Sequence, residues 1–170
     1  HKNSYKIQST VSLFERLDDD HVSLSSIKVS KFYLSFQEKV DRLESILSTI
    51  SRVLDVILTV QRKWLYLESI FLSSGDIMEQ LPDEHEIFSK TNQQFKEKMD
   101  FFNSCKKAKL ICCEDQNILK DFDSMHIKLE KVQKSLDNYL QIKRTIFPRF
   151  YFVSDDDLLG IISKAREPQS

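Results

Sequence analysis

The sequence predicts an all-α protein, an elongated bundle of long antiparallel helices with heptad-like seams. Its 170 residues include only 2 glycines and 3 prolines, too few for the repeated tight turns of strand-and-hairpin folds. Apolar residues also recur at alternating steps of four and three along two long segments, a pattern typical of packed helices. Hydrophobic residues make up 41% of the chain and charged residues 30%, which suits a helical protein with a core and a solvated face.

Two helices are predicted first, over about residues 7–30 and 33–72. The first has an apolar stripe of Val11, Phe14, Leu17, Leu24 and Ile27. The second has a seam of Phe36, Val40, Leu43, Leu47, Ile50, Leu54, Ile57, Trp64 and Phe71, flanked by a column of Ile46, Val53, Val60 and Leu67. Three apolar columns exceed what one partner helix buries, so we expect at least two neighbours. At 1.5 Å per residue the second helix would be roughly 60 Å long, which favours an elongated architecture.

The remaining helices are separated by short breaks. Residues 74–106 are predicted to form a short helix and then a helix opened by Pro82, where proline and the following acidic residues suit a first turn. A further helix is expected over 115–146. Its seam is Ile118, Phe122, Met125, Leu129, Val132, Leu136 and Tyr139. A last helix is predicted over 155–166.

Residues 147–154, here called the aromatic elbow, interrupt this pattern with the sequence FPRFYFVS. Pro148 removes a backbone donor and pushes Phe147 out of helical geometry. Three consecutive aromatic residues, Phe150, Tyr151 and Phe152, cannot share one helix face. We therefore expect their rings to enter pockets between helices or on a partner surface. We further hypothesise that Arg149 and the rings lock the last helix in place.

The last helix should begin with a capped, acidic first turn. Ser154 and Asp157 have the spacing of a capping box, and Asp155, Asp156 and Asp157 suit the positive end of the helix dipole. This interpretation is preferred over a carboxylate site for Mg²⁺ or Ca²⁺.

Features of nucleotide, metal and catalytic sites are missing from the sequence. Its two glycines, Gly75 and Gly160, cannot form a phosphate-binding loop. Two Asp-x-x-His pairs, Asp18/His21 and Asp123/His126, are poor matches to the Glu-x-x-His ligands of helical di-metal centres, and surface or interface histidines are the default. We expect no catalytic, cofactor or metal site in these residues.

Charge and cysteine content restrict the partners and the compartment. A formal net charge of −1 provides no general attraction for nucleic acid or acidic membranes, and no apolar run approaches a membrane span. Cys105, Cys112 and Cys113 lack disulfide-framework or zinc spacing, so free thiols in a reducing compartment are expected. His1 in place of Met and the abrupt last residues lead us to expect a fragment of a longer protein.

Several motifs resemble the linker region of dynein heavy chains, in the family's order and spacing. They are WLYLESIF at 64–71, LP at 81–82, VQKSLDNYL at 132–140 and KRTIFPRFYFVSDDDLLGII at 143–162. The resemblance covers residues 33–167, and its most specific part is the aromatic-Pro-Arg stretch followed by DLL. Val153 and the Ile161-Ile162 pair make the likeness closer to cytoplasmic than to axonemal chains, whereas Ser154 and Gly160 depart from the family pattern.

The resemblance implies a mechanical, non-catalytic role. In dyneins the linker is a helical lever that bends and straightens across a ring of AAA+ ATPase modules and moves the motor along microtubules. ATP and Mg²⁺ would bind in the parent ring. The partners implied are the ring, neighbouring linker helices and, through the parent, other dynein subunits and the microtubule. The implied location is the cytoplasm and microtubule cytoskeleton, with the axoneme as an alternative. No nucleic acid or membrane partner is expected.

The implied docking or structural residues are those within the matching motifs. They are Trp64, Tyr66, Phe71, Phe147, Pro148, Arg149, Phe150, Tyr151, Phe152, Ser154 and Asp157. A stand-alone coiled-coil or spectrin-like scaffold is the alternative from a different functional class, since it also explains the seams and the low glycine content. A helical-bundle metalloenzyme is a third alternative.

Overall fold

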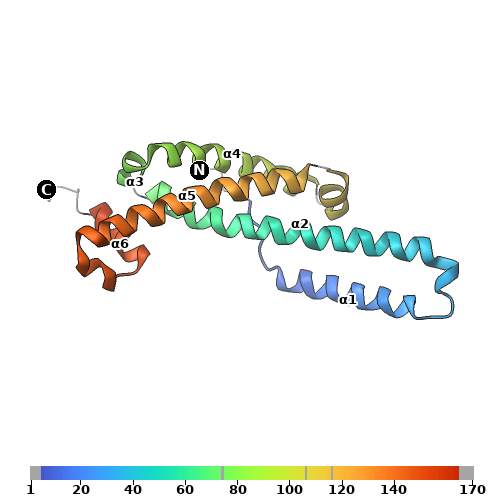
Figure 1. Cartoon of the computed structure of the whole chain (residues 1–170). Coiled ribbons are helices and arrows are strands. Elements are labelled where there is room, and N and C mark those ends of the chain that lie inside the picture. Colours follow the sequence, from blue (N-terminus) through green and yellow to red (C-terminus); the bar gives the residue numbers. More distant parts are fainter. Residues whose placement is uncertain (1–4, 74, 106, 116, 165–170) are drawn as a thin grey trace. The chain divides into compact units, whose positions relative to one another are not determined.

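The computed structural model describes residues 5–73, 75–105, 107–115 and 117–164. Every regular element within these ranges is helical (Figure 1), which confirms the all-α class. The α-helices are α1 (Val11–Lys28), α2 (Tyr33–Ser73), α3 (Gly75–Gln80), α4 (Pro82–Cys105), α5 (Ile118–Ile146) and α6 (Asp155–Lys164). A π-helical turn, Leu110–Glu114, precedes α5, and a 3₁₀ turn, Pro148–Phe152, follows it.

These bounds differ from the expected ones mainly at helix starts. The first helix begins at Val11 rather than near residue 7, after Ser9 adopts a positive φ of 54°. α5 begins at Ile118, because Asp115 has extended backbone (ψ 95°) and its carboxylate accepts a hydrogen bond from the backbone N–H of Asn117. Pro82 does open α4. The expected limits at residues 74, 106 and 166 lie outside the described residues.

The chain divides into two compact units. The first unit comprises residues 1–59 and 96–123, and the second comprises residues 60–95 and 124–170. The long helices run through this division, so α2, α4 and α5 each contribute residues to both units.

In the first unit, α1 lies beside the first part of α2 (Figure 1). Lys28, at the end of α1, forms ion pairs with Glu44 and, at 3.4 Å, with Asp41 of α2, and the Tyr33 hydroxyl donates to Asp41 at 2.9 Å. Leu17 and Leu24 are the buried residues of α1. The pairing of the two helices therefore combines a narrow apolar stripe with charge contacts near the connecting loop.

The other part of the first unit joins the end of α4 to the start of α5. The Lys98 ammonium lies 2.8 Å from the Asp121 carboxylate and 3.4 Å from that of Asp115. The ring of Phe102 stacks on that of Phe122, with centroids 5.9 Å apart. A charged cluster and an aromatic pair thus hold the two ends of this connection together.

The second unit has a core of large aromatic side chains from α2 and α4. Trp64 stacks on Phe95 with centroids 4.5 Å apart, and its indole N–H donates to the Asn92 side-chain oxygen at 2.9 Å. Phe71 stacks on Phe88 at 5.2 Å. The α5 seam contributes Met125, Leu129, Val132, Leu136 and Leu140, all buried. Rings of this size make the largest contributions to burial and also fix orientation by stacking.

The seam predicted along α2 is only partly covered. Val40 and the positions from Ile50 onward are buried, whereas Phe36 and Leu43 remain about half exposed at 53% and 51%. Heptad spacing identifies the apolar face of a helix but does not identify the segment that covers this face. Two seam positions in the first part of α2 therefore stay accessible in the structure.

Candidate functional site

The aromatic elbow follows directly from the proline at position 148. Phe147 has φ −125° and ψ 85°, the extended geometry expected before proline, and Pro148 occupies the first position of the 3₁₀ turn. In a 3₁₀ turn residues three apart share a side. The rings of Phe147 and Phe150 accordingly lie 5.6 Å apart, centroid to centroid.

Arg144, in the last turn of α5, holds the elbow to the start of α6. Its Nε donates to the Phe150 carbonyl at 3.2 Å and its Nη2 donates to the Val153 carbonyl at 2.9 Å. The same Nη2 lies 2.7 Å from the Asp155 carboxylate. Since the Arg144 side chain is only 14% exposed, these charge-assisted contacts are partly shielded from solvent. One side chain therefore connects α5, the elbow and α6.

The start of α6 is capped as the sequence predicts. The backbone N–H of Asp157 donates to the Ser154 hydroxyl oxygen at 3.2 Å, and the hydroxyl donates to the Asp157 carboxylate at 2.7 Å. Leu158 and Leu159 are buried. α3 and α6 pack against each other within the second unit. The cap fixes where α6 begins, and the two leucines anchor it in the unit.

The rings of the elbow do not enter pockets between helices, which corrects one of the two outcomes expected from the sequence. No residue of the 3₁₀ turn is buried, and Phe152 is 94% exposed, with Tyr151 and Phe147 near one half. The Arg144 side chain reaches the backbone carbonyls of Phe150 and Val153, so its contacts do not cover the rings. Docking of these rings on a partner surface stays a prediction.

Arg149 has a different place from the one hypothesised. Its guanidinium lies over the rings of Phe147 and Phe150, at 5.9 Å and 5.3 Å from their centroids. The contacts from the elbow to α6 come instead from Arg144. Sequence reasoning missed Arg144, although a basic residue in the last turn of a helix, followed after a break by an acidic first turn, was an available signal.

Tyr66 lies in the electrostatic field of the same region. Burial, and then the carboxylates of Asp155, Asp137 and Asp156, raise the pKa of the Tyr66 hydroxyl above its ordinary value. Burial and the nearby Asp155 carboxylate also raise the pKa of Asp137, against a smaller opposing effect of Lys63. Carboxylates of α5 and α6 therefore lie near Tyr66 of α2.

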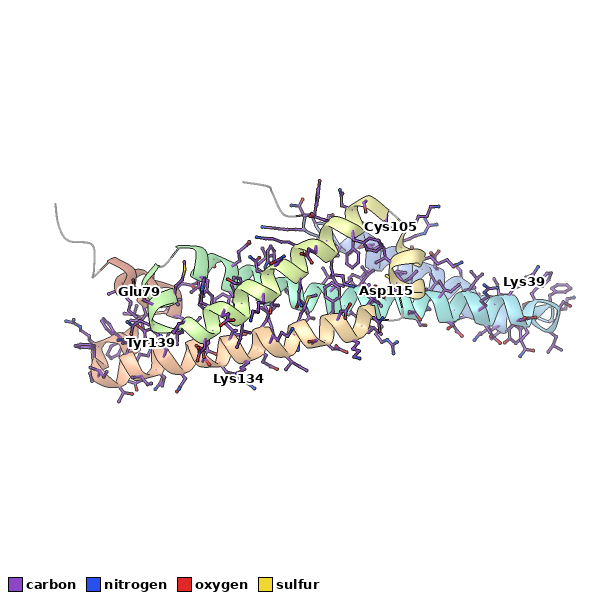
Figure 2. The ribbon with its side chains drawn as sticks, turned by 90° about the horizontal axis from the view of Figure 1, so that it is seen from above. Lys39, Glu79, Cys105, Asp115, Lys134 and Tyr139 are labelled. Carbon is purple, nitrogen blue, oxygen red and sulfur yellow. The ribbon has the colours of Figure 1, made fainter. Side chains whose placement is uncertain are left out.

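The other implied residues belong to the core rather than to the elbow. Trp64 and Phe71 are almost fully buried against α4. Farther along α5, the Lys143 ammonium lies 5.0 Å from the Tyr139 ring centroid. Figure 2 labels Tyr139 and, on the exposed side of α5, Lys134. The Tyr66 hydroxyl thus lies near the acidic first turn of α6, whereas Trp64 and Phe71 pack in the core against α4.

Two observations on the described residues concern metal binding and thiol chemistry. Among these residues, no three His, Cys, Asp or Glu side chains cluster as metal ligands would. Burial raises the pKa of the Cys112 thiol to about 11, far from that of an activated nucleophile. In the described part of the chain, no helix is long and apolar enough to span a bilayer. What the elbow can supply is a fixed, exposed set of aromatic rings and a guanidinium.

Comparisons with known proteins identify the relatives of this sequence. The family described as "Dynein heavy chain, N-terminal region 2" matches residues 1–170. The dynein-1-beta heavy chain of the flagellar inner arm I1 complex from Chlamydomonas reinhardtii is 44% identical over 99% of the chain. Human dynein axonemal heavy chain 2 is also 44% identical over 99% of it, and a cytoplasmic dynein heavy chain from Paramecium tetraurelia is 37% identical over 91%.

These matches confirm the family expected from the motifs. The Chlamydomonas and human chains named above have higher identities than the Paramecium cytoplasmic chain, so these identities do not favour the cytoplasmic subclass suggested by residues 150–162. The chain spans about 4% of the length of its flagellar and axonemal relatives and 3% of the cytoplasmic one.

Proposed function

The chain belongs to the dynein heavy chain family, and we propose that it forms part of the mechanical linker of a microtubule motor. In this role it contains no catalytic site itself. It couples ATP hydrolysis, carried out by AAA+ modules elsewhere in the parent chain, to movement along microtubules. The parent would act in the microtubule cytoskeleton, in the cytoplasm or the axoneme.

The joint between α5 and α6 is the observation that carries this proposal. A lever transmits force only if the connections between its helices resist bending. Here a break in helix geometry is held by three polar contacts from one partly buried arginine, a proline-fixed turn and a capped helix start. Such a joint is stiffer than a flexible loop, because its backbone groups are fixed at several points.

The core of the second unit supports the same role. Stacked rings of α2 and α4 and the continuous α5 seam leave little room for relative sliding of these helices. The sequence has no glycine-rich phosphate loop, so the proposal assigns nucleotide binding to other parts of the parent. Helices that bury stacked rings and a continuous apolar seam resist bending, which a non-catalytic lever requires.

The test measures movement of this region in the intact motor. A fluorophore is incorporated at Lys134, an exposed position of α5, and a second one is placed in the ATPase portion of the same heavy chain. A lever predicts an energy-transfer efficiency that changes between the nucleotide-free and ATP-bound states. An unchanged efficiency, measured in a motor that still hydrolyses ATP, would contradict the lever role and leave a static scaffold.

A matched pair of variants tests coupling directly. Arg144→Gln weakens the joint, whereas Arg52→Gln removes a positive charge from an exposed position of α2. We expect Arg144→Gln to lower the microtubule gliding velocity relative to the ATP turnover, while Arg52→Gln leaves both unchanged. Equal losses of velocity and turnover would indicate general damage rather than lost coupling.

A further inference from the structure

We propose that the end of the first unit where α1 connects to α2 binds an amphipathic helix of a separate protein, one with carboxylates along the edge of its apolar face. The binding surface is an apolar stripe of Phe32, Phe36 and Leu43, here called the tip stripe, with Lys39 and Arg42 at its edge. The inference rests on the proposed function only in that the chain works within a motor assembly. It goes beyond that function by naming a surface and the chemistry of its partner.

The tip stripe lies at a projecting end of the first unit. Figures 1 and 2 show the connection between α1 and α2 extending past the connection between α4 and α5, which belongs to the same unit. Figure 2 labels Lys39 at the projecting end, and Cys105 and Asp115 at the other connection. At this end α1 is the helix that lies beside α2. A projecting pair of helices is accessible to another protein.

α1 covers a different side of α2 from the one that carries the stripe. Lys28 of α1 pairs with Asp41 and Glu44 of α2. At about 3.6 residues per turn, these two acidic positions lie roughly 120° around α2 from Phe36 and Leu43. The members of the stripe are spaced four and seven apart, so they share one helix face. The contact with α1 therefore leaves this face open.

The exposure of the stripe contrasts with that of the same apolar column farther along α2. Phe32 is 63% exposed, Phe36 53% and Leu43 51%, whereas Ile50, the next position at heptad spacing, is 9% exposed. Since a phenylalanine side chain has on the order of 150–250 Å² of surface, the stripe presents an apolar area on the order of 300 Å². Contiguous apolar patches of a few hundred Å² are often interaction sites.

The charges beside the stripe specify the edge of the partner. Lys39 and Arg42 are exposed, and within the described ranges neither forms an ion pair. The Lys31 ammonium lies 5.1 Å from the centroid of the Phe32 ring, at the head of the stripe. Glu38 is also exposed, but it lies roughly 150° around α2 from the stripe. A matching helix therefore carries Asp or Glu beside its apolar residues, where they can accept charge-assisted hydrogen bonds.

The same charges argue against a second copy of this chain as the partner. A two-fold contact uses the same surface on both copies. Lys39 and Arg42 would then face their own counterparts, and like charges brought together at an interface cost free energy. An amphipathic helix of opposite edge charge avoids this cost, and its apolar residues, spaced three and four apart, match a straight apolar stripe. A separate protein with such a helix is the partner that fits both features.

The experiment places a photo-crosslinker in the intact heavy chain, within the purified motor assembly. Phe36→p-benzoylphenylalanine keeps an aromatic group in the stripe, and Ile127→p-benzoylphenylalanine places the same group at a 67% exposed position of α5 as a control. Lys39→p-benzoylphenylalanine repeats the measurement from the edge of the stripe in case the first variant does not fold. Linked peptides are identified by mass spectrometry, and ATP turnover of each variant verifies that the motor is intact.

We expect positions 36 and 39, and not position 127, to crosslink to a protein other than the heavy chain, at a peptide with apolar residues three and four apart and Asp or Glu beside them. In the position 36 variant, adding Lys39→Glu and Arg42→Glu should lower the crosslink yield several-fold, whereas adding Lys134→Glu, on the exposed side of α5, should leave it unchanged. A crosslink to the same heavy chain or to a second copy of it, or none from either position, would overturn the proposal. Energy transfer from Lys134 tests the lever role separately, so failure of one is distinguishable from failure of the other.

Discussion

The guanidinium of Arg144 lies 2.7 Å from the carboxylate of Asp155, across a break in helix that contains a proline. The same guanidinium group binds two backbone carbonyls within that break. A residue of the last turn of α5 thereby contacts both the break and the first residue of α6. Breaks between helices are usually more mobile than the helices themselves, and here three polar contacts from one side chain hold the break.

Substituting Arg144 should therefore loosen α6 specifically. Arg144→Gln removes the ion pair and leaves the Phe150 and Val153 carbonyls without their charged donor, a loss of about 1.5–3 kcal/mol by the usual range for charged hydrogen bonds. We expect faster hydrogen exchange of the α6 backbone amides, measured by mass spectrometry. Arg149→Gln should leave that exchange unchanged, and equal loosening by both variants would return the locking role to Arg149.

The pKa of Asp137 gives a prediction with a defined sign. Because burial and Asp155 raise it above the ordinary 3.8, the folded chain holds more protons than the unfolded chain between those two values. Stability contributed by this group therefore falls as pH rises through that window. Asp137→Asn should raise the melting temperature at about pH 7 and lose that advantage at about pH 3, where the carboxyl is protonated in both states.

Asp123, another exposed aspartate of the same helix, provides the control for this measurement. Asp123→Asn removes the same charge from α5 at a position distant in sequence from α6. Melting curves of both variants at the two pH values separate the local effects of desolvation and Asp155 on Asp137 from the general effect of net charge. Equal stabilisation by the two substitutions would show that the environment of Asp137 is not special.

Gly160 offers a simple stabilising substitution. It lies in α6 on an exposed position, and a Cβ atom built there meets no heavy atom within 4 Å. Alanine loses less backbone entropy than glycine on entering a helix, so Gly160→Ala should stabilise the fold by about 0.5–1 kcal/mol. Urea denaturation followed by circular dichroism checks the sign. A destabilised variant would mean that an additional contact of this helix face exists in solution.

Trp64 should be the most sensitive core position of the second unit. Trp64→Ala removes a fully buried ring that stacks on Phe95, and large-to-small changes of this kind cost about 3–5 kcal/mol. Trp64→Phe retains an aromatic ring while removing the N–H that Asn92 accepts, so a smaller loss is expected. Because the chain has two units, denaturation should be followed with probes in each, and a change confined to the first unit would contradict this assignment.

The sequence predicted what depends on periodicity. Every position of the α5 seam from Ile118 to Leu136 is buried. Apolar residues spaced three and four apart lie on one face of an α-helix, so the buried face follows directly from the spacing. Pro82 and Ser154 marked helix starts for equally local reasons. Each of these features requires only the residues within one or two turns.

The sequence could not predict contacts that depend on the path of the backbone after a helix ends. The Arg144 contacts require the carbonyls of Phe150 and Val153 to face back toward α5, which follows from the whole 3₁₀ turn and not from any residue type. Likewise, the π-helical turn Leu110–Glu114 has no periodic signal. The exposure of Phe36 and Leu43 was missed because spacing identifies an apolar face without identifying its cover.

Cys112 should be the least reactive of the three cysteines. Its thiol is buried, and burial with the neighbouring Cys113 raises its pKa to about 11, so only ~0.1% is thiolate at about pH 8. Cys105 and Cys113 are partly exposed. Brief iodoacetamide treatment of the folded chain, followed by peptide mass spectrometry, should modify Cys112 last. In guanidinium chloride the three should react alike, and fast modification of Cys112 in the folded chain would mean that the turn containing it opens readily.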